Sequence, residues 1–147
     1  MLDVFCFKEN QLYGSEIPQT IDDFEYLKKI GIKVIISFNK GIQEIKQKTK
    51  FDDYFIHHEI FITDYMTPTK SQVKEFISLL VKYREEKKPV LIHCWAGCGR
   101  TGLMLALAER FVYGEKDPEK AIQNVKKVRP CAVETQEQRE FILKYEM

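Results

Sequence analysis

The sequence lacks long hydrophobic runs and any strong imbalance of charge. No stretch of about 18 consecutive apolar residues occurs, so no transmembrane helix is expected. The 23 basic and 22 acidic residues nearly cancel, which gives no bulk attraction to nucleic acid or to a membrane surface. Residues Met1 to Val4 contain no basic segment of the kind that begins a secretory signal. We therefore expect a cytoplasmic protein with neither a membrane nor a nucleic-acid partner.

Patterns for metal binding and for internal repeats are also missing. Two of the three histidines, His57 and His58, are adjacent in a stretch with strand character, where neighbouring side chains point to opposite faces and cannot share a metal ion. No repeat, low-complexity segment or linker divides the chain. The sequence thus predicts no metal, no cofactor and one globular domain spanning residues 1–147. It does not determine the oligomeric state, for which a monomer is the default expectation.

The segment from His93 to Gly102 carries the most chemical information. It reads His-Cys-Trp-Ala-Gly-Cys-Gly-Arg-Thr-Gly, follows the short apolar run Val90–Ile92 and precedes a run rich in helix-forming residues. This order predicts a strand, a tight glycine-containing loop and the start of a helix, whose backbone N–H groups and dipole favour an anion. Cys94 lies where a thiolate would be stabilised, and Arg100 has the planar donors that match phosphate oxygens.

With these residues in place, the segment resembles the signature loop of the cysteine-dependent protein tyrosine phosphatase superfamily, His-Cys-x5-Arg-Ser/Thr-Gly. It is most similar to the small dual-specificity branch, including its compact archaeal members. It is not a nucleotide-binding loop, because no Gly-Lys-Ser/Thr ending is present. The resemblance covers nearly the whole chain and implies a phosphoric monoester hydrolase of the protein-tyrosine or dual-specificity type.

The order of predicted elements is typical of an α/β fold. We expect strands over residues 3–7, 11–14, 32–37, 51–60 and 90–93, and helices over 21–30, 69–88, 101–113, 118–128 and 135–145, with a shorter helix within 41–50. Strands that alternate with helices, followed by helices alone, predict three layers, with a central, mostly parallel β-sheet flanked by helices, as in dual-specificity phosphatases. Cys94 would then lie at the carboxyl end of a central strand, where such sheets bind their ligands.

Phosphate-monoester hydrolysis through a cysteine requires a nucleophile and a cradle for the phosphoryl oxygens. The resemblance implies that Cys94 is the nucleophile and forms a thiophosphate intermediate. We assign the cradle to the backbone N–H groups of the loop and to the guanidinium of Arg100. The expected phosphate-binding residues are Trp95, Ala96, Gly97, Cys98, Gly99 and Arg100.

The reaction also needs an acid that protonates the leaving oxygen. The family often supplies an aspartate within Asp-x-x-x-Pro before a helix, and Asp64-Tyr-Met-Thr-Pro68 matches this pattern. The same carboxylate would then activate the water that attacks the intermediate. Asp52, Asp53 and Glu59 are the alternative acids.

Two residues that flank the nucleophile receive supporting roles from the resemblance. Thr101 would donate its hydroxyl to the departing thiolate; its alternative is an ordinary residue of the first helical turn. His93, on the strand beside the nucleophile, would orient Cys94 through hydrogen bonds to the loop backbone, and simple core packing is its alternative.

A segment near the C-terminus extends the resemblance. Residues 129–138 are similar to the Arg-Pro-Gly-Ala-Val-x-Thr-x-x-Gln sequence of archaeal and related members, in which the glutamine helps to place the hydrolytic water. Gln138 is the positional match and Gln136 the alternate, although Thr135 and Gln138 also form a capping-box pattern. Cys131 replaces the usual glycine, so the turn is strained or different if that position needs a positive φ.

The chain contains four cysteines. Because one of them resembles a nucleophile, we expect the thiols to be reduced, with Cys6 in the core. Cys98 lies four residues after Cys94 and has two interpretations. It is either a neutral side chain that points out of the loop, or a partner that pairs with Cys94 upon oxidation and protects it.

The substrate is less constrained than the chemistry. Phosphoinositide-specific relatives carry lysines within this loop, whereas this chain has Trp95, Ala96 and Cys98 there. Trp95 favours phosphotyrosine by stacking, and the short loops favour a shallow pocket that also admits phosphoserine and phosphothreonine. Phosphorylated proteins are therefore the expected partners. A phosphatase for a small molecule or an RNA 5′ end, and a phosphate-binding module without turnover, are the alternatives.

Overall fold

Residues 1–147 are described by a computed structural model, in which five strands form one sheet in the order β1-β2-β5-β3-β4. The strands are β1 (Val4–Lys8), β2 (Leu12–Ser15), β3 (Val34–Ser37), β4 (Ile56–Glu59) and β5 (Val90–His93). β1 pairs antiparallel with β2, and all other neighbours are parallel. The register pairs Ser37, the last residue of β3, with His93, the last residue of β5. The mostly parallel sheet predicted from the sequence is confirmed.

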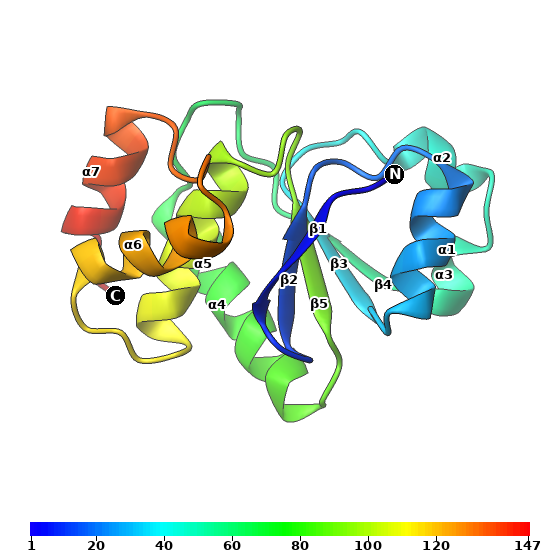
Figure 1. The fold of residues 1–147 in the computed structure, drawn as a ribbon, viewed down its shortest axis with the longest axis horizontal. Helices are drawn as coiled ribbons and strands as arrows, with labels where there is room; N and C mark the ends of the chain where they lie inside the picture. Colours follow the sequence, from blue (N-terminus) through cyan, green and yellow to red (C-terminus); the bar gives the residue numbers. More distant parts are fainter.

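Helices cover both faces of this sheet (Figure 1). One face carries α1 (Ile21–Lys29), α2 (Gln43–Gln47) and α3 (Phe51–Tyr54), and the other carries α4 (Lys70–Glu85), α5 (Gly99–Phe111), α6 (Pro118–Val128) and α7 (Gln136–Lys144). Because side chains alternate along a strand, Ile35 and Leu91 join the core under α1 and α3, whereas Ile36 and Ile92 join the larger core under α4 to α7. The predicted three-layer α/β fold is confirmed.

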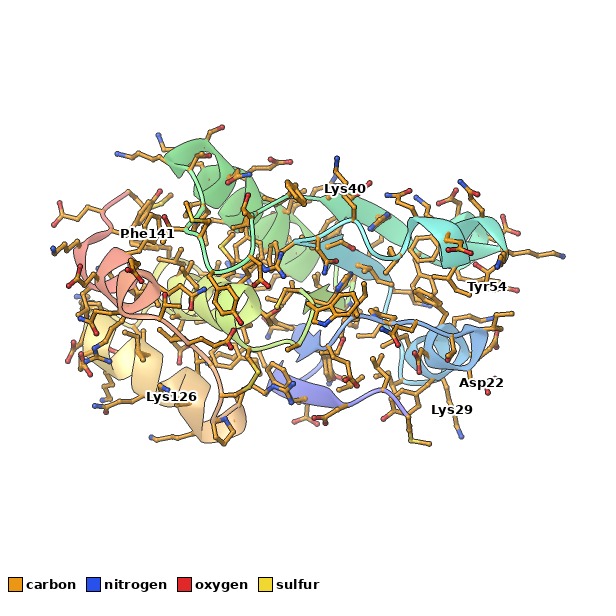
Figure 2. All side chains as sticks on the ribbon, turned by 90° about the horizontal axis from the view of Figure 1, so that it is seen from above. Asp22, Lys29, Lys40, Tyr54, Lys126 and Phe141 are labelled. Carbon is orange, nitrogen blue, oxygen red and sulfur yellow. A yellow bond between two sulfur atoms is a disulfide. The ribbon has the colours of Figure 1, made fainter.

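The two helical layers give the molecule an elongated outline. Seen from above, Tyr54 and Asp22 lie at the end formed by α1 and α3, and Phe141 and Lys126 lie at the opposite end (Figure 2). The sheet lies between these two ends (Figure 1). No helix has the length and the apolar character needed to cross a bilayer.

The strand predicted over residues 51–60 is wrong in its first half. Residues Phe51–Tyr54 form the short helix α3, and β4 begins only at Ile56. The ring of Phe51 is buried, with its centroid 5.4 Å from that of Phe24 and 5.1 Å from that of Phe55. This aromatic packing overrides the strand propensity of the stretch.

Two other details of the prediction concern the site directly. Helix α5 begins at Gly99 and not at residue 101, so Arg100 and Thr101 lie in its first turn. The ring of His57 packs against Phe51 of α3, whereas His58 forms a hydrogen bond with the hydroxyl of Tyr83 in α4. The two adjacent histidines therefore face opposite sides of the sheet, as predicted.

Candidate active site

The loop between β5 and α5 lies at the carboxyl edge of the parallel strands (Figure 1). Its first residue, Cys94, is buried and its thiol is not part of a disulfide. None of the backbone N–H groups of residues 95–98 donates a hydrogen bond to a backbone carbonyl. The next residues, Gly99 and Arg100, open helix α5, where N–H groups have no intrahelical acceptor. The loop thus presents a run of free donors and the positive end of a helix to one region.

Gly97 allows this loop to bend. Its φ of 74° lies in the left-handed region, and a Cβ built on it would come within 2.6 Å of the backbone carbonyl of Ser15 at the end of β2. Any side chain at this position would therefore push the loop away from the sheet.

The outer side of the loop is held by contacts to its carbonyl groups. Ile17 N–H donates to the carbonyl of Trp95 at 3.0 Å. Arg129, which follows α6, donates from Nη2 to the carbonyl of Ala96 at 2.9 Å and from Nε to that of Gly97 at 3.2 Å, and its Nη1 bonds to Asp3 at 2.7 Å. Because the carbonyls are bound on the outside, the N–H groups face the other way. The sequence motif includes Arg129 but does not indicate that its side chain binds the carbonyls of the loop.

Arg100 and Asp64 are in contact. The guanidinium of Arg100 is buried and donates from Nη1 to the carbonyl of Ile62 at 2.9 Å, while its Nη2 lies 3.4 Å from Oδ1 of Asp64. Its Nε is also buried and has no protein partner. The Asp64 side chain is more than half exposed and also accepts from the N–H of Tyr65 at 3.0 Å. The Asp64 carboxylate is therefore exposed to solvent and adjacent to the arginine that is expected to bind phosphate.

The alternative acids lie in other settings. Asp52 pairs with Lys46 at 3.5 Å, and Glu59 accepts from the side chain of Gln43 at 2.7 Å. Asp53 is exposed on α3, which belongs to the opposite helical layer from α5. None of the three forms a hydrogen bond or an ion pair with Arg100 or with the loop.

Thr101 and His93 lie on either side of the nucleophile. The buried hydroxyl of Thr101 donates to Sγ of Cys94 at 3.1 Å. His93 is fully buried, and its Nδ1 lies 3.1 Å from the carbonyl oxygen of Cys94. Burial lowers the pKa of His93 to about 4, so the ring is neutral at neutral pH and donates to the carbonyl as a neutral imidazole. Both contacts fix the orientation of Cys94.

Gln138 and Gln136 have different surroundings. The side chain of Gln138 is buried at the start of α7, where its Oε1 accepts from the N–H groups of Glu134 and Thr135 at 2.9 and 3.2 Å. Its Nε2 has no partner and would come within 2.9 Å of a Cβ at Gly99, so this amide borders the loop. Gln136 is exposed and its side chain lies 3.4 Å from that of Glu140. The predicted capping box at Thr135 is also present, so one side chain serves both the cap and the loop.

The expectation of reduced cysteines is wrong for two of the four. Cys98 and Cys131 form a disulfide with a Cα–Cα distance of 5.3 Å, so neither a free Cys98 nor a bond between Cys98 and Cys94 is present. Cys6 is exposed and is not in the core as expected. The disulfide connects the loop to the turn before α7, and residues 33 apart in sequence give no local signal of such a pair.

The turn around Cys131 does differ from a glycine turn. Cys131 does not have a positive φ; instead Val133, two residues later, has a φ of 60°. A β-branched residue rarely adopts this conformation. Position 131 therefore needs no positive φ, and the strain considered for Cys131 is not present there. The turn differs instead, because its left-handed residue is Val133, next to Glu134, whose N–H is bound by Gln138.

The surroundings of the loop combine exposed apolar side chains with acidic ones. Trp95, Tyr65, Met66 and Phe61 are each at least half exposed around the loop and the Asp64 segment. Beside Trp95 lies a hollow of about 780 Å³, whose polar lining includes Glu16, Asp22 and Asp23. A surface of this kind suits an apolar or basic ligand and disfavours one with many negative charges.

Comparisons with known proteins agree with this geometry. A family model described as "Tc-R-P: Polymorphic toxin system, DSP-PTPase phosphatase" matches residues 11–110. The human protein named dual specificity protein phosphatase CDC14C is 34% identical over 94 residues, which cover 64% of this chain and 20% of that protein. An uncharacterized protein from Methanocaldococcus jannaschii is 33% identical over 84 residues, which cover 57% of this chain and 51% of that protein. The matches thus span about a fifth of the length of the human relative and about half of the archaeal one.

Solved structures share the fold over almost the whole chain. Kinase associated phosphatase superposes with a TM-score of 0.75 at 23% identity, covering 97% of this chain and 91% of that one. The active form of Tk-PTP gives a TM-score of 0.76 at 24% identity, covering 96% of this chain and 93% of that one. The family model includes both Asp64 and the loop from Cys94 to Arg100. This chain therefore belongs to the DSP-PTPase phosphatase family described for polymorphic toxin systems.

Proposed function

We propose that residues 1–147 form a single catalytic domain that hydrolyses phosphate monoesters on proteins, phosphotyrosine foremost and phosphoserine and phosphothreonine as well. The observation that carries this proposal is the run of unpaired N–H groups at residues 95–98, which directly follows the buried Cys94 and leads to Arg100, whose Nε has no partner. A run of unpaired backbone N–H groups beside an arginine suits the binding of a phosphoryl dianion.

In the first step, Sγ of Cys94 attacks phosphorus and the bond to the substrate oxygen breaks. The loop N–H groups and Arg100 bind the three phosphoryl oxygens, whose negative charge they stabilise in the transition state. In this step Asp64 acts in its protonated form and gives that proton to the leaving oxygen, so the substrate side chain leaves as a neutral hydroxyl and Asp64 is left as the carboxylate that acts in the second step. The contact of Asp64 with Arg100 at 3.4 Å supports this choice over Asp52 and Asp53.

In the second step, water attacks the phosphorus of the thiophosphate intermediate. The Asp64 carboxylate takes a proton from this water, and the bond between phosphorus and sulfur breaks to release inorganic phosphate. Thr101 donates to the departing Sγ, a role supported by its distance of 3.1 Å. Gln138 binds the attacking water through Nε2, which borders the loop at Gly99 and has no other partner.

The surface around the loop favours a protein substrate over the alternatives. The exposed rings of Trp95, Tyr65 and Phe61 offer apolar area to a phosphotyrosine ring and to neighbouring peptide side chains. The acidic lining beside Trp95 would repel the further phosphates of an RNA end or of an inositol phosphate. A binding module without turnover would not need an exposed carboxylate next to the arginine.

The test compares kcat/KM for a panel of phosphotyrosine, phosphoserine and phosphothreonine peptides, inositol phosphates and 5′-phosphorylated RNA. We expect the phosphotyrosine peptides to be the best substrates and Cys94→Ser to be inactive on all of them. Asp64→Ala should lower kcat by about 10²–10⁴, and Asp53→Ala, which removes an exposed carboxylate from α3, is the matched control. Unchanged turnover by Asp64→Ala, or higher kcat/KM for RNA or inositol phosphates, would overturn the respective part of the proposal.

A further inference from the structure

An unbroken chain of hydrogen bonds connects the nucleophile to a lysine in the opposite layer of the fold. His93 Nδ1 lies 3.1 Å from the carbonyl oxygen of Cys94, and His93 Nε2 lies 2.6 Å from Oγ of Ser37. The same Oγ lies 2.8 Å from Nε2 of His57, whose Nδ1 lies 3.3 Å from Nζ of Lys46. These groups come from three parallel strands and from α2.

The strand register brings the three central groups together. Ser37 pairs with His93 in β5 on one side, and β3 pairs with β4 on the other, with Ile35 opposite His57. Ser37 and His93 are fully buried, and His57 is partly buried. The hydroxyl of Ser37 therefore has two histidine partners and no access to water to replace them.

The direction of donation along this chain is fixed at both ends. The ammonium of Lys46 can only donate, so Nδ1 of His57 accepts and its proton is on Nε2. The carbonyl of Cys94 can only accept, so Nδ1 of His93 donates and its Nε2 accepts. Ser37 then accepts from His57 and donates to His93, and every group has one partner for each role.

Both rings must be neutral for this arrangement, and their environment favours the neutral form. Burial, and then the positive charge of Lys46, lower the pKa of His57 to about 4, and burial lowers that of His93 to about 4. Asp52 lies 3.5 Å from Lys46 and holds the ammonium at the outer end of the chain. Hydrogen bonds aligned in one direction strengthen one another.

We propose that Ser37, His57 and Lys46 are positioning residues that act on the nucleophile through His93. They hold the His93 ring as the Nδ1–H tautomer, and this ring fixes the peptide group of Cys94 so that Sγ faces the loop. The inference rests on the proposed phosphatase function for its kinetic consequences, but the tautomer of His93 is a property of the folded protein alone.

The first test is the ¹⁵N NMR spectrum of the two histidine rings in the wild-type protein at pH 7. We expect a protonated Nδ1 and an unprotonated Nε2 for His93, and the opposite pattern for His57. A protonated Nε2 on His93 would overturn the proposal, whether or not the protein hydrolyses any phosphate ester.

The second test substitutes residues of the hydrogen-bond chain. Ser37→Ala and His57→Leu should each lower kcat on a phosphotyrosine peptide about fivefold to tenfold, because the loss of one hydrogen bond changes an equilibrium or a rate by about that factor. KM should change less than about twofold. The rate at which iodoacetamide alkylates Cys94 at pH 6 should fall in parallel, and this readout needs no turnover. His57→Gln, whose amide nitrogen can still donate to Ser37, should recover most of both rates.

The matched control is His58→Leu. His58 is next to His57 on the same strand and loses a comparable hydrogen bond, to the Tyr83 hydroxyl at 2.6 Å, but it lies on the other face of the sheet. We expect its kcat and alkylation rate to remain within twofold of wild type. Equal losses in His58→Leu and His57→Leu, or wild-type rates in Ser37→Ala, would mean that the chain has only a structural role. If neither the wild-type protein nor any variant turns over a phosphate ester, but the ¹⁵N spectrum has the expected pattern, the phosphatase function is rejected and the hydrogen-bond chain is retained.

Discussion

Removal of the disulfide between Cys98 and Cys131 should weaken the fold markedly. The bond closes a segment of 33 residues that contains α5, α6 and the turn after α6. For a loop of this length, the chain-entropy relation says that the bond removes about 12.5 cal/mol/K of entropy from the unfolded state, which is about 3.7 kcal/mol at 25 °C. Native contacts next to the bond, such as those of Arg129 with the loop carbonyls, keep the folded state in register after reduction.

We expect Cys131→Ser to lower the free energy of unfolding by about 3 to 4 kcal/mol in urea titrations followed by circular dichroism. The m-value should rise, because the unfolded chain without the bond is less compact and exposes more surface. For a chain of this size the melting temperature would fall by about 6 to 15 °C. Mild reduction of the wild-type protein should give the same shift. Cys6→Ser, which removes a thiol outside the bond, is the control and should have the stability of wild type.

The number of reactive thiols tests directly whether the disulfide is present. The native protein should react with a thiol reagent at two positions after unfolding, Cys6 and Cys94, and at four only after reduction. Four reactive thiols in unreduced protein, or equal urea midpoints for wild type and Cys131→Ser, would refute the reasoning.

Three further substitutions or conditions give distinct outcomes. Gly97→Ala should lower kcat/KM more than about a hundredfold and destabilise the fold, because its Cβ meets the backbone of Ser15 at 2.6 Å. Gly114→Ala is the control, since Gly114 has a φ of 85° but open space around it. Its free energy of unfolding in urea titrations should fall by only about 1 kcal/mol, and its activity should be retained. Gln138→Leu leaves two N–H groups without their acceptor, so we expect the free energy of unfolding in urea to fall by about 1 to 3 kcal/mol. Phosphoenzyme should accumulate in quenched-flow assays, and dephosphorylation at the wild-type rate would contradict the proposed role of Gln138. The pKa of His93 is about 6.5 in the unfolded chain and about 4 in the folded protein, because burial disfavours the charged ring. Its contribution to stability is therefore complete above pH 6.5 and is lost as the pH falls toward 4, by at most about 1.4 kcal/mol per pH unit. Urea midpoints that do not fall between pH 6.5 and 4.5 would contradict this.

Residues close together in sequence account for what could be predicted of the fold and the site. The loop from His93 to Gly102 is one local motif, and its chemistry requires the neighbouring strand and helix that the sequence also indicates. Helices with clear apolar stripes and capping residues, such as α4 after Thr69, have the predicted bounds within a few residues. The roles of Asp64 and Gln138 rest on matches to short motifs, and they stay proposals.

Features formed by distant residues could not be predicted from the sequence. The bond between Cys98 and Cys131 depends on how the turn after α6 meets the loop, and no local pattern encodes that approach. The hydrogen-bond chain through Ser37 depends on the register of β3 between two other strands. Helix α3 arises because Phe51 is buried among other rings, a tertiary effect that outweighs the local preference for a strand.

The most direct measurement is mass spectrometry of the protein quenched with acid during turnover of a phosphotyrosine peptide. The account predicts a phosphoryl group on Cys94 in wild type, more of it in Gln138→Leu, and none in Cys94→Ser, which should also release no phosphate. Phosphate release without a phosphorylated Cys94, or turnover by Cys94→Ser, would contradict the central claim that this loop transfers the phosphoryl group through its cysteine.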